Sequence, residues 1–166
     1  FCHRSVYEKV GKYDEELVRN QDDEFSYRLR KAGGHIICNP EIVSYYNTRS
    51  TISGLWRQYF QYGFYKVRVL QKHPRQMSLR QFIPPTFVST LILGLLISMI
   101  FPWGWIFLTA LVGIYLLANL TASTLIAIRK GWKLFWPLPL VFATIHISYG
   151  LGFWAGIFKF WNRWSC

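Results

Sequence analysis

The second half of the chain consists of long apolar runs separated by short polar breaks. Residues 81–128 contain no Asp, Glu, Lys or Arg, and neither do residues 134–158. Because crossing about 30 Å of hydrocarbon takes roughly 20 apolar residues, the first run is long enough for two transmembrane helices. We expect spans near residues 83–101, 105–127 and 137–158, with the sequence FPWGW at 101–105 as the turn between the first two. The pattern therefore predicts an integral membrane protein.

Residues 51–73 repeat apolar and aromatic side chains at steps of three and four, which predicts an amphipathic helix. Its other face is polar and basic, which suits a helix lying in the membrane interface. The alternative is a surface helix that packs its stripe on a soluble core. A single-stranded nucleic-acid platform over residues 49–80 is disfavoured because the aromatic residues keep a helical period, so we expect no nucleic-acid partner. The stripe consists of Ile52, Leu55, Trp56, Tyr59, Phe60, Phe64, Val67 and Leu70.

The first third of the chain predicts a short mixed fold. Residues 14–34 form a loop and then a helix, which Gly33 and Gly34 end. The β-branched and aromatic runs at 35–38 and 41–46, separated by Asn39-Pro40, predict two short strands. One helix and two strands bury too little surface to fold alone.

Charge divides the chain as sharply as hydropathy does. The formal net charge is +11, yet all eight acidic residues fall between Glu8 and Glu41. Basic residues precede the first span and follow the second, which predicts that the N-terminal part is cytoplasmic. Lys159 and Arg163 would then face the opposite side, so either the tail is re-entrant or a further span is missing.

Three cysteines, Cys2, Cys38 and Cys166, are widely spaced and lack the spacing of a zinc site. We expect them to be free thiols, as the reducing cytoplasm implies. The chain begins with Phe1 and not with Met, so we expect it to be part of a longer protein. The sequence GLGFWAG at 150–156 is typical of helix packing through small residues.

Asp22, Asp23 and Glu24 open the predicted helix. Acids in a first helical turn complement the positive end of the macrodipole. Glu24 and Arg28 stand at i, i+4, the spacing of a helical ion pair. Neither explanation requires a function, and neither accounts for the order of the motifs around these acids.

That order resembles the acceptor-side half of family 2 glycosyltransferases. The family includes membrane-attached enzymes of bacterial exopolysaccharide synthesis, such as succinoglycan biosynthesis, and its members have the GT-A fold. The resemblance covers about residues 1–73. The matching motifs are Gly11 to Glu15, Gln21 to Phe25, Arg28-Leu29, Gly33, Pro40 and Gln58 to Tyr62.

The resemblance implies an inverting transfer from a nucleotide-sugar donor to a lipid-linked or polysaccharide acceptor, a hexosyltransferase-like activity in the bacterial inner membrane. It assigns the catalytic base to Asp22, which takes a proton from the acceptor hydroxyl. Glu24 and Arg28 match positions that orient the site or brace the helix, and we place them with the expected substrate-binding residues. Gln58, Gln61 and Tyr62 match the helix that borders the donor and acceptor pocket. Membrane lipid is a further expected partner.

Two departures from the family pattern favour a single-addition enzyme over a processive synthase. Gln21 replaces the usual Glu before the base, and Gln61-Tyr62 replaces the usual Arg-Trp. The family also binds a divalent metal, Mg or Mn, through an Asp-x-Asp motif in its preceding half, and no such motif occurs here. The resemblance therefore places the metal ligands outside this chain, and we expect this portion alone to be inactive.

The expected organisation has three parts: residues 1–49 as the end of a GT-A glycosyltransferase domain, 50–81 as an amphipathic helix with a basic linker, and 82–166 as the transmembrane region. The fold class is mixed, with an α/β remnant of a helix and two strands before helical spans. The competing hypothesis is a non-catalytic small membrane protein or subunit that binds lipid or partners, and a donor-binding test separates the two.

Overall fold

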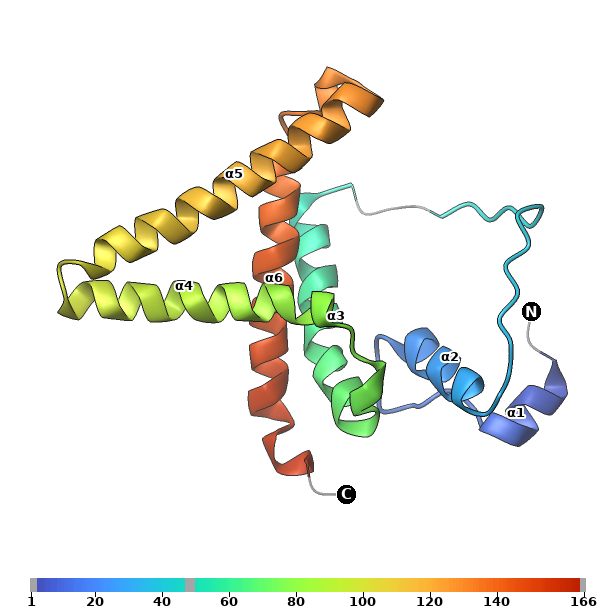
Figure 1. Ribbon diagram of the computed structural model, residues 1–166. Helices are drawn as coiled ribbons and strands as arrows, with labels where there is room; N and C mark the ends of the chain where they lie inside the picture. The colour runs from blue at the N-terminus through green and yellow to red at the C-terminus, as the bar shows by residue number, and fades with distance from the viewer. Residues whose placement is uncertain (1–2, 47–49, 165–166) are drawn as a thin grey trace.

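The computed structural model describes residues 3–46 and 50–164, and within these ranges every regular element is helical. Two short helices lie on one side of the molecule, two long ones run side by side at its centre, and a helical hairpin projects from the other side (Figure 1). The helices are α1 (Arg4–Val10), α2 (Gln21–Lys31), α3 (Ile52–Lys72), α4 (Ile83–Ile100), α5 (Gly104–Lys130) and α6 (Leu138–Lys159), with 3-10 turns at Pro74–Gln76, Leu79–Phe82, Trp132–Leu134 and Trp161–Arg163.

The expected α/β remnant with two strands is wrong. Residues 35–46 form an extended, irregular segment, and no strand occurs in the described part of the chain. A strand needs a neighbour for its backbone N–H and C=O groups, and no other described segment forms a backbone ladder with residues 35–46. Its apolar side chains stand in the open, with Ile37 88% and Tyr45 98% exposed. The sequence has the composition of strands, but the described residues form no sheet that it could join.

The N-terminal segment packs around the predicted helix. α2 begins and ends close to the predicted positions, and Gly33 follows it in the left-handed region at φ 81°. Phe25 of α2 is buried against Tyr13, with ring centroids 4.8 Å apart. α1 was not predicted. Cys38 is a free, exposed thiol as expected, whereas Cys2 and Cys166 lie outside the described residues.

α3 occupies nearly the predicted range, and its partner is α6. Thr51 caps α3 by accepting a hydrogen bond from the Gly54 N–H at 3.1 Å. The two helices run in the same direction, side by side (Figure 1). A Cβ atom at Gly152 would overlap the Phe60 carbonyl, and one at Gly156 would lie 2.5 Å from the Phe64 carbonyl oxygen. The small-residue prediction for residues 150–156 is thus confirmed: these glycines bring the two backbones into contact.

α4 and α5 form the predicted hairpin, whose turn falls at residues 101–103. A Cβ atom at Gly104 would lie 2.6 Å from the Ser98 backbone, so the start of α5 packs closely on α4. α4 crosses α6 near Gly150, where a Cβ atom would lie 2.6 Å from the Pro84 carbonyl oxygen. Among the described residues, three helices are long and apolar enough to cross a membrane: Leu79–Ile100, Gly104–Lys130 and Leu138–Lys159. Their positions match the three predicted spans.

Candidate active site

The start of α2 is fixed by a backbone conformation that few side chains tolerate. Asn20 has φ 64°, the one positive φ of a non-glycine residue in the described ranges. Asparagine adopts this left-handed conformation more readily than most residues. Its side-chain Nδ2 donates to the Tyr62 carbonyl oxygen at 3.1 Å, which ties the beginning of α2 to the middle of α3. This turn places Asp22 at the second position of the helix.

Asp22 differs from the two acids that follow it. Its side chain is exposed, and no cationic group in the described ranges lies within ion-pair distance of its carboxylate. Asp23 instead pairs with the buried Lys66, and Glu24 pairs with Arg28. Of the three acids, Asp22 alone presents a carboxylate that is free to accept a proton.

Asp22 opens onto a pocket of ≈ 380 Å³ between the start of α2 and the middle of α3. A second pocket of ≈ 220 Å³ continues along the polar face of α3, and Arg19 lines both. Arg19 Nε donates to Gln61 Oε1 at 3.1 Å, and Gln58 Nε2 donates to the Tyr62 hydroxyl at 2.9 Å. The first pocket is lined by Tyr13, Val18, Arg19, Asn20, Gln21, Asp22 and Tyr62, and the second by Arg19, Gly54, Arg57, Gln58 and Gln61.

The structure thus brings together four of the six predicted site residues, namely Asp22, Gln58, Gln61 and Tyr62. It also adds Arg19 and Arg57, which the sequence interpretation missed. Arg19 directly precedes the Asn20 turn, and Arg57 directly precedes Gln58. A basic residue next to a predicted site position could have indicated that it belongs to the site. However, their meeting in one pocket depends on the docking of α2 against α3.

The other two predicted site residues, Glu24 and Arg28, face the protein interior. Glu24 is 2% exposed, and Arg28 binds it at 2.6 and 2.9 Å through two nitrogen atoms. Arg28 also donates to the carbonyl oxygens of Val10 and Lys12, and His73 lies 2.9 Å from Glu24. This bidentate pair holds the loop after α1 and the end of α3 against α2. Both groups have partners within the protein, and their contact with substrate remains a prediction.

A cluster of ion pairs attaches the segment before α2 to the end of α3. Arg68 binds Glu16 at 3.0 and 3.1 Å, and Lys72 binds both Glu16 and Asp14. Arg163, beyond α6, also pairs with Glu16. Hydrogen bonds from Arg68 and Lys72 lower the pKa of Glu16 to about 2. Burial opposes the charge on Lys72, but its hydrogen bonds to Asp14 and Glu16 outweigh burial and raise the pKa of Lys72. We call Asp14, Glu16, Arg68, Lys72 and Arg163 the Glu16 cluster.

The described residues do not fit a divalent metal. No group of three His, Cys, Asp or Glu side chains lies close enough together in this part of the chain to hold one. The acids that do lie close together are already neutralised by Lys66, Arg68 and Lys72.

Two known proteins resemble this chain along most of its length. It is 30% identical over 159 residues to succinoglycan biosynthesis protein ExoA of Rhizobium meliloti (strain 1021), an alignment that covers 95% of this chain and 46% of that protein. The second protein is the dolichyl N-acetyl-alpha-D-glucosaminyl phosphate 3-beta-D-2,3-diacetamido-2,3-dideoxy-beta-D-glucuronosyltransferase of Methanococcus voltae. This chain is 27% identical to it over 154 residues, and the alignment covers 89% of this chain and 42% of that protein.

The chain spans about half the length of these curated relatives. No protein-family model matches it, and no solved structure matches it. The two likenesses support a relation to glycosyltransferases. Together with the three apolar helices, they support a membrane-associated protein of that kind.

Proposed function

We propose that this chain is the acceptor-side portion of a membrane-bound, inverting family 2 glycosyltransferase. The enzyme moves a sugar from a nucleotide-sugar donor to a lipid-linked or polysaccharide acceptor. The observation that carries the proposal is the free carboxylate of Asp22, which opens onto the pocket while Asp23 and Glu24 beside it are paired. The likeness to ExoA and to the archaeal glucuronosyltransferase supports the reaction class.

In the proposed reaction the acceptor hydroxyl oxygen attacks the anomeric carbon of the donor sugar. The bond from that carbon to the diphosphate oxygen breaks, and the nucleoside diphosphate leaves with the bonding electron pair. Asp22 takes the acceptor proton, which requires an approach of about 2.6 to 3.2 Å to the hydroxyl oxygen. Because attack and departure occur on opposite faces of the sugar, the configuration inverts. Any divalent metal that assists the leaving group would have its ligands outside this chain.

The two pockets that share Arg19 offer groups suited to holding a saccharide. Arg19 and Arg57 supply cationic donors, and Gln58 and Gln61 supply amides that both donate and accept. Tyr62 lines the first pocket with Asp22, and its hydroxyl group accepts a hydrogen bond from Gln58. We assign acceptor positioning to these side chains and proton transfer to Asp22. Glu24 and Arg28 act as positioning residues that fix α2.

The test is Asp22→Asn in the native full-length protein. Because general-base catalysis contributes about 10²- to 10⁴-fold, we expect sugar transfer to fall by that factor, while membrane insertion and donor binding stay intact. Glu15→Gln is the matched control: Glu15 is an exposed acid outside both pockets, and its replacement should leave the rate unchanged. Wild-type transfer by the Asp22→Asn protein would overturn the assignment. Absence of donor binding by the wild-type protein would favour a non-catalytic membrane subunit.

A further inference from the structure

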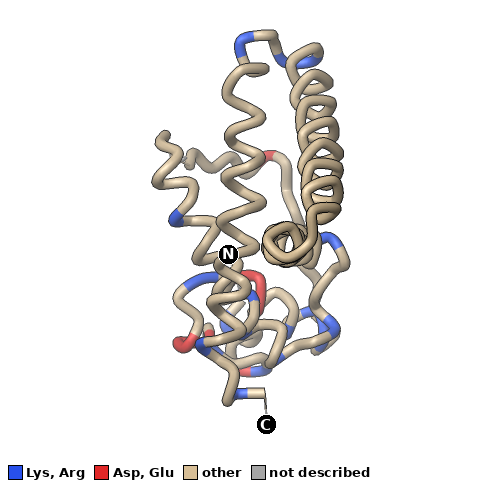
Figure 2. The backbone as a smooth tube through the Cα atoms, turned by 90° about the vertical axis from the view of Figure 1, so that its left-hand side faces the viewer, with Lys and Arg blue, Asp and Glu red and all other residues tan. Residues whose placement is uncertain are grey.

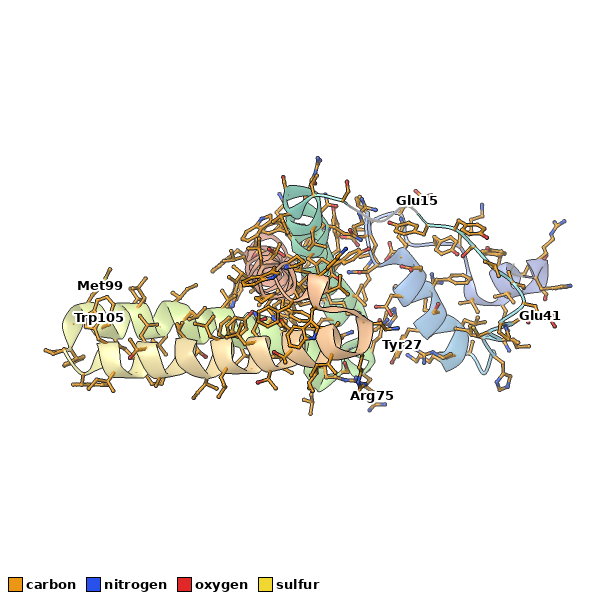
Figure 3. All side chains as sticks on the ribbon, turned by 90° about the horizontal axis from the view of Figure 1, so that it is seen from above. Glu15, Tyr27, Glu41, Arg75, Met99 and Trp105 are labelled. Atoms are coloured by element: carbon orange, nitrogen blue, oxygen red, sulfur yellow. The ribbon has the colours of Figure 1, made fainter. Side chains whose placement is uncertain are left out.

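The three apolar helices do not share one direction. In Figure 1, α4 and α5 project to one side from α6, which runs across their base beside α3. Seen from above, α6 points along the line of sight, whereas α4 and α5 lie lengthwise, with Met99 and Trp105 at their far end (Figure 3). A bilayer oriented for the hairpin to cross it would therefore have α6 lying along its surface. By length and composition alone, all three helices qualify equally as membrane spans.

The charged residues of α3 indicate how the molecule is oriented in the bilayer. Gly63, Gly152 and Gly156 hold the backbones of α3 and α6 in contact, so the two helices must occupy the same depth. α3 carries Arg57, Lys66, Arg68 and Lys72, which extend over about 22 Å of helix at 1.5 Å per residue. A charged group at the bilayer centre costs about 2.5 to 3.5 kcal/mol or more. If α6 crossed the hydrocarbon, it would carry this charged helix and its paired acids with it.

The hairpin has the surface of a membrane span. The 18-residue apolar stretches of α4 and α5 are only 22% and 17% buried, against 33% for α6. The hairpin carries no charged residue from its beginning through its tip, and the first charges after the tip are Arg129 and Lys130 at the C-terminal end of α5. Figure 2 shows the tube of the hairpin almost free of blue and red. α4 is about 27 Å long and α5 about 40 Å, so α5 fits a bilayer only by tilting, and it is the oblique helix in Figure 1. Trp103 and Trp105 at the tip are exposed, as expected of side chains at a headgroup boundary.

Both ends of α6 are basic, which the same orientation explains. Arg129, Lys130 and Lys133 precede α6, and Lys159 and Arg163 follow its apolar part. α6 runs from Leu138 to Lys159, so the two groups lie beyond or at its opposite ends. If α6 crossed the membrane, one group would have to face the far side, against the preference of basic loops for one side. The pairing of Arg163 with Glu16 instead keeps the tail beside the acidic segment.

α6 is apolar without being a span because other helices cover it. α3 lies along one side, and α4 crosses it near Gly150. Trp154 of α6 donates to Ser89 Oγ of α4 at 2.8 Å. Its most exposed apolar side chains, Leu140 and Phe158, lie near its two ends. The apolar composition of α6 thus serves contact with neighbouring helices.

We propose that only α4 and α5 cross the membrane, and that α3 and α6 together lie in the headgroup region of one leaflet, on the side of the acidic segment. The partner of this α3–α6 layer is a lipid surface. Lys133 and Lys159 of this layer, with Arg129 and Lys130 at the adjoining end of α5, have no ion-pair partner among the described residues, and we assign them to lipid phosphates. The exposed Trp132, Trp136 and Trp161 anchor the ends of the layer. This topology does not depend on the chemistry proposed for Asp22.

The test is cysteine accessibility in the native full-length protein, with Cys2, Cys38 and Cys166 replaced by Ser. Single cysteines are introduced as Lys133→Cys before α6, Asn162→Cys after it and Trp103→Cys at the hairpin tip. A membrane-impermeant maleimide is applied to spheroplasts and to inside-out vesicles, and detergent-solubilised protein controls for reactivity. We expect positions 133 and 162 to react in the same preparation and position 103 only in the other.

Labelling of positions 133 and 162 in opposite preparations would show that α6 spans the membrane and would overturn the proposal. Labelling of all three positions in one preparation would also overturn it, because the hairpin would then not cross. Asp22→Asn should leave the labelling pattern unchanged. Loss of sugar transfer in Asp22→Asn with the expected labelling pattern would therefore bear on the proposed chemistry alone. A labelling pattern other than the expected one, in protein that still transfers sugar, would bear on the proposed topology alone.

Discussion

The hairpin α4–α5 and the pair α3–α6 are both close helix pairs, but different interactions hold them together. α4 and α5 are neighbours in sequence, joined by a turn of three residues, and much of their surface is exposed and apolar. α3 and α6 are distant in sequence, meet backbone to backbone through glycines, and end in the Glu16 cluster. A short turn and apolar side chains are nearly sufficient to hold a helical hairpin together in lipid. The α3–α6 pair needs shape and charge complementarity.

The largest expected effect comes from filling the α3–α6 contact. Gly152→Leu in the full-length protein places side-chain atoms where the Phe60 carbonyl stands, and neither backbone can move away without unpacking the other. We expect a loss of about 3 kcal/mol or more in the free energy of unfolding in detergent. Gly113→Leu on α5 is the matched control, because nothing lies within 4 Å of a Cβ atom there. Equal stability of the two variants would show that α3 and α6 are not in contact.

The next effect tests the Glu16 cluster. Glu16→Gln leaves Arg68 and Lys72 without their shared carboxylate, and we expect a loss of about 1 to 2 kcal/mol, between the values for exposed and buried pairs. The measurement is chemical unfolding at pH 7, with Glu15→Gln as the control, since Glu15 has no ion-pair partner in the described ranges.

The same substitution has a pH signature. The folded pKa of Glu16 is about 2, below its ordinary value of 4.5. The stabilisation is therefore fully present above pH 4.5 and declines as the pH falls from 4.5 towards 2. The difference in stability between wild type and Glu16→Gln should shrink over that window. A difference that stays constant from pH 6 to pH 3 would contradict an ionic origin.

The smallest effect is expected in the hairpin. Leu117 on α5 is 69% exposed, and lipid replaces whatever a truncated side chain leaves open. We expect Leu117→Ala to change the free energy of unfolding in bilayers or detergent by no more than about 0.5 kcal/mol. Val67→Ala on α3 removes fewer atoms but empties a fully buried position at the α6 contact, so it should cost about 1 to 2 kcal/mol. If Leu117→Ala were the more costly variant, α5 would have a protein partner and not lipid on that face.

The candidate site was predictable to the extent that it follows chain order. Asp22 could be singled out because it opens a helix within an ordered set of motifs, and the Gln58, Gln61 and Tyr62 group because it follows on a second helix. The sequence did not reveal that Glu24 and Arg28 turn inward, or that Arg19 reaches Gln61. Both facts depend on how α2 docks against α3, which involves residues about 40 positions apart.

By itself, the sequence determined the helical segments of this protein: the range of α3, the two helices of the hairpin with their turn, and the apolar length of α6. Periodicity and hydropathy are local properties, so they set these elements without reference to the rest of the chain. Only the tertiary structure decided that residues 35–46 lack a sheet to join, that Asp22 is free while its neighbours are paired, and that α6 lies crosswise to the hairpin beside a charged helix. Those outcomes depend on which segments far apart in the sequence come into contact. The local pattern of residues does not specify such contacts.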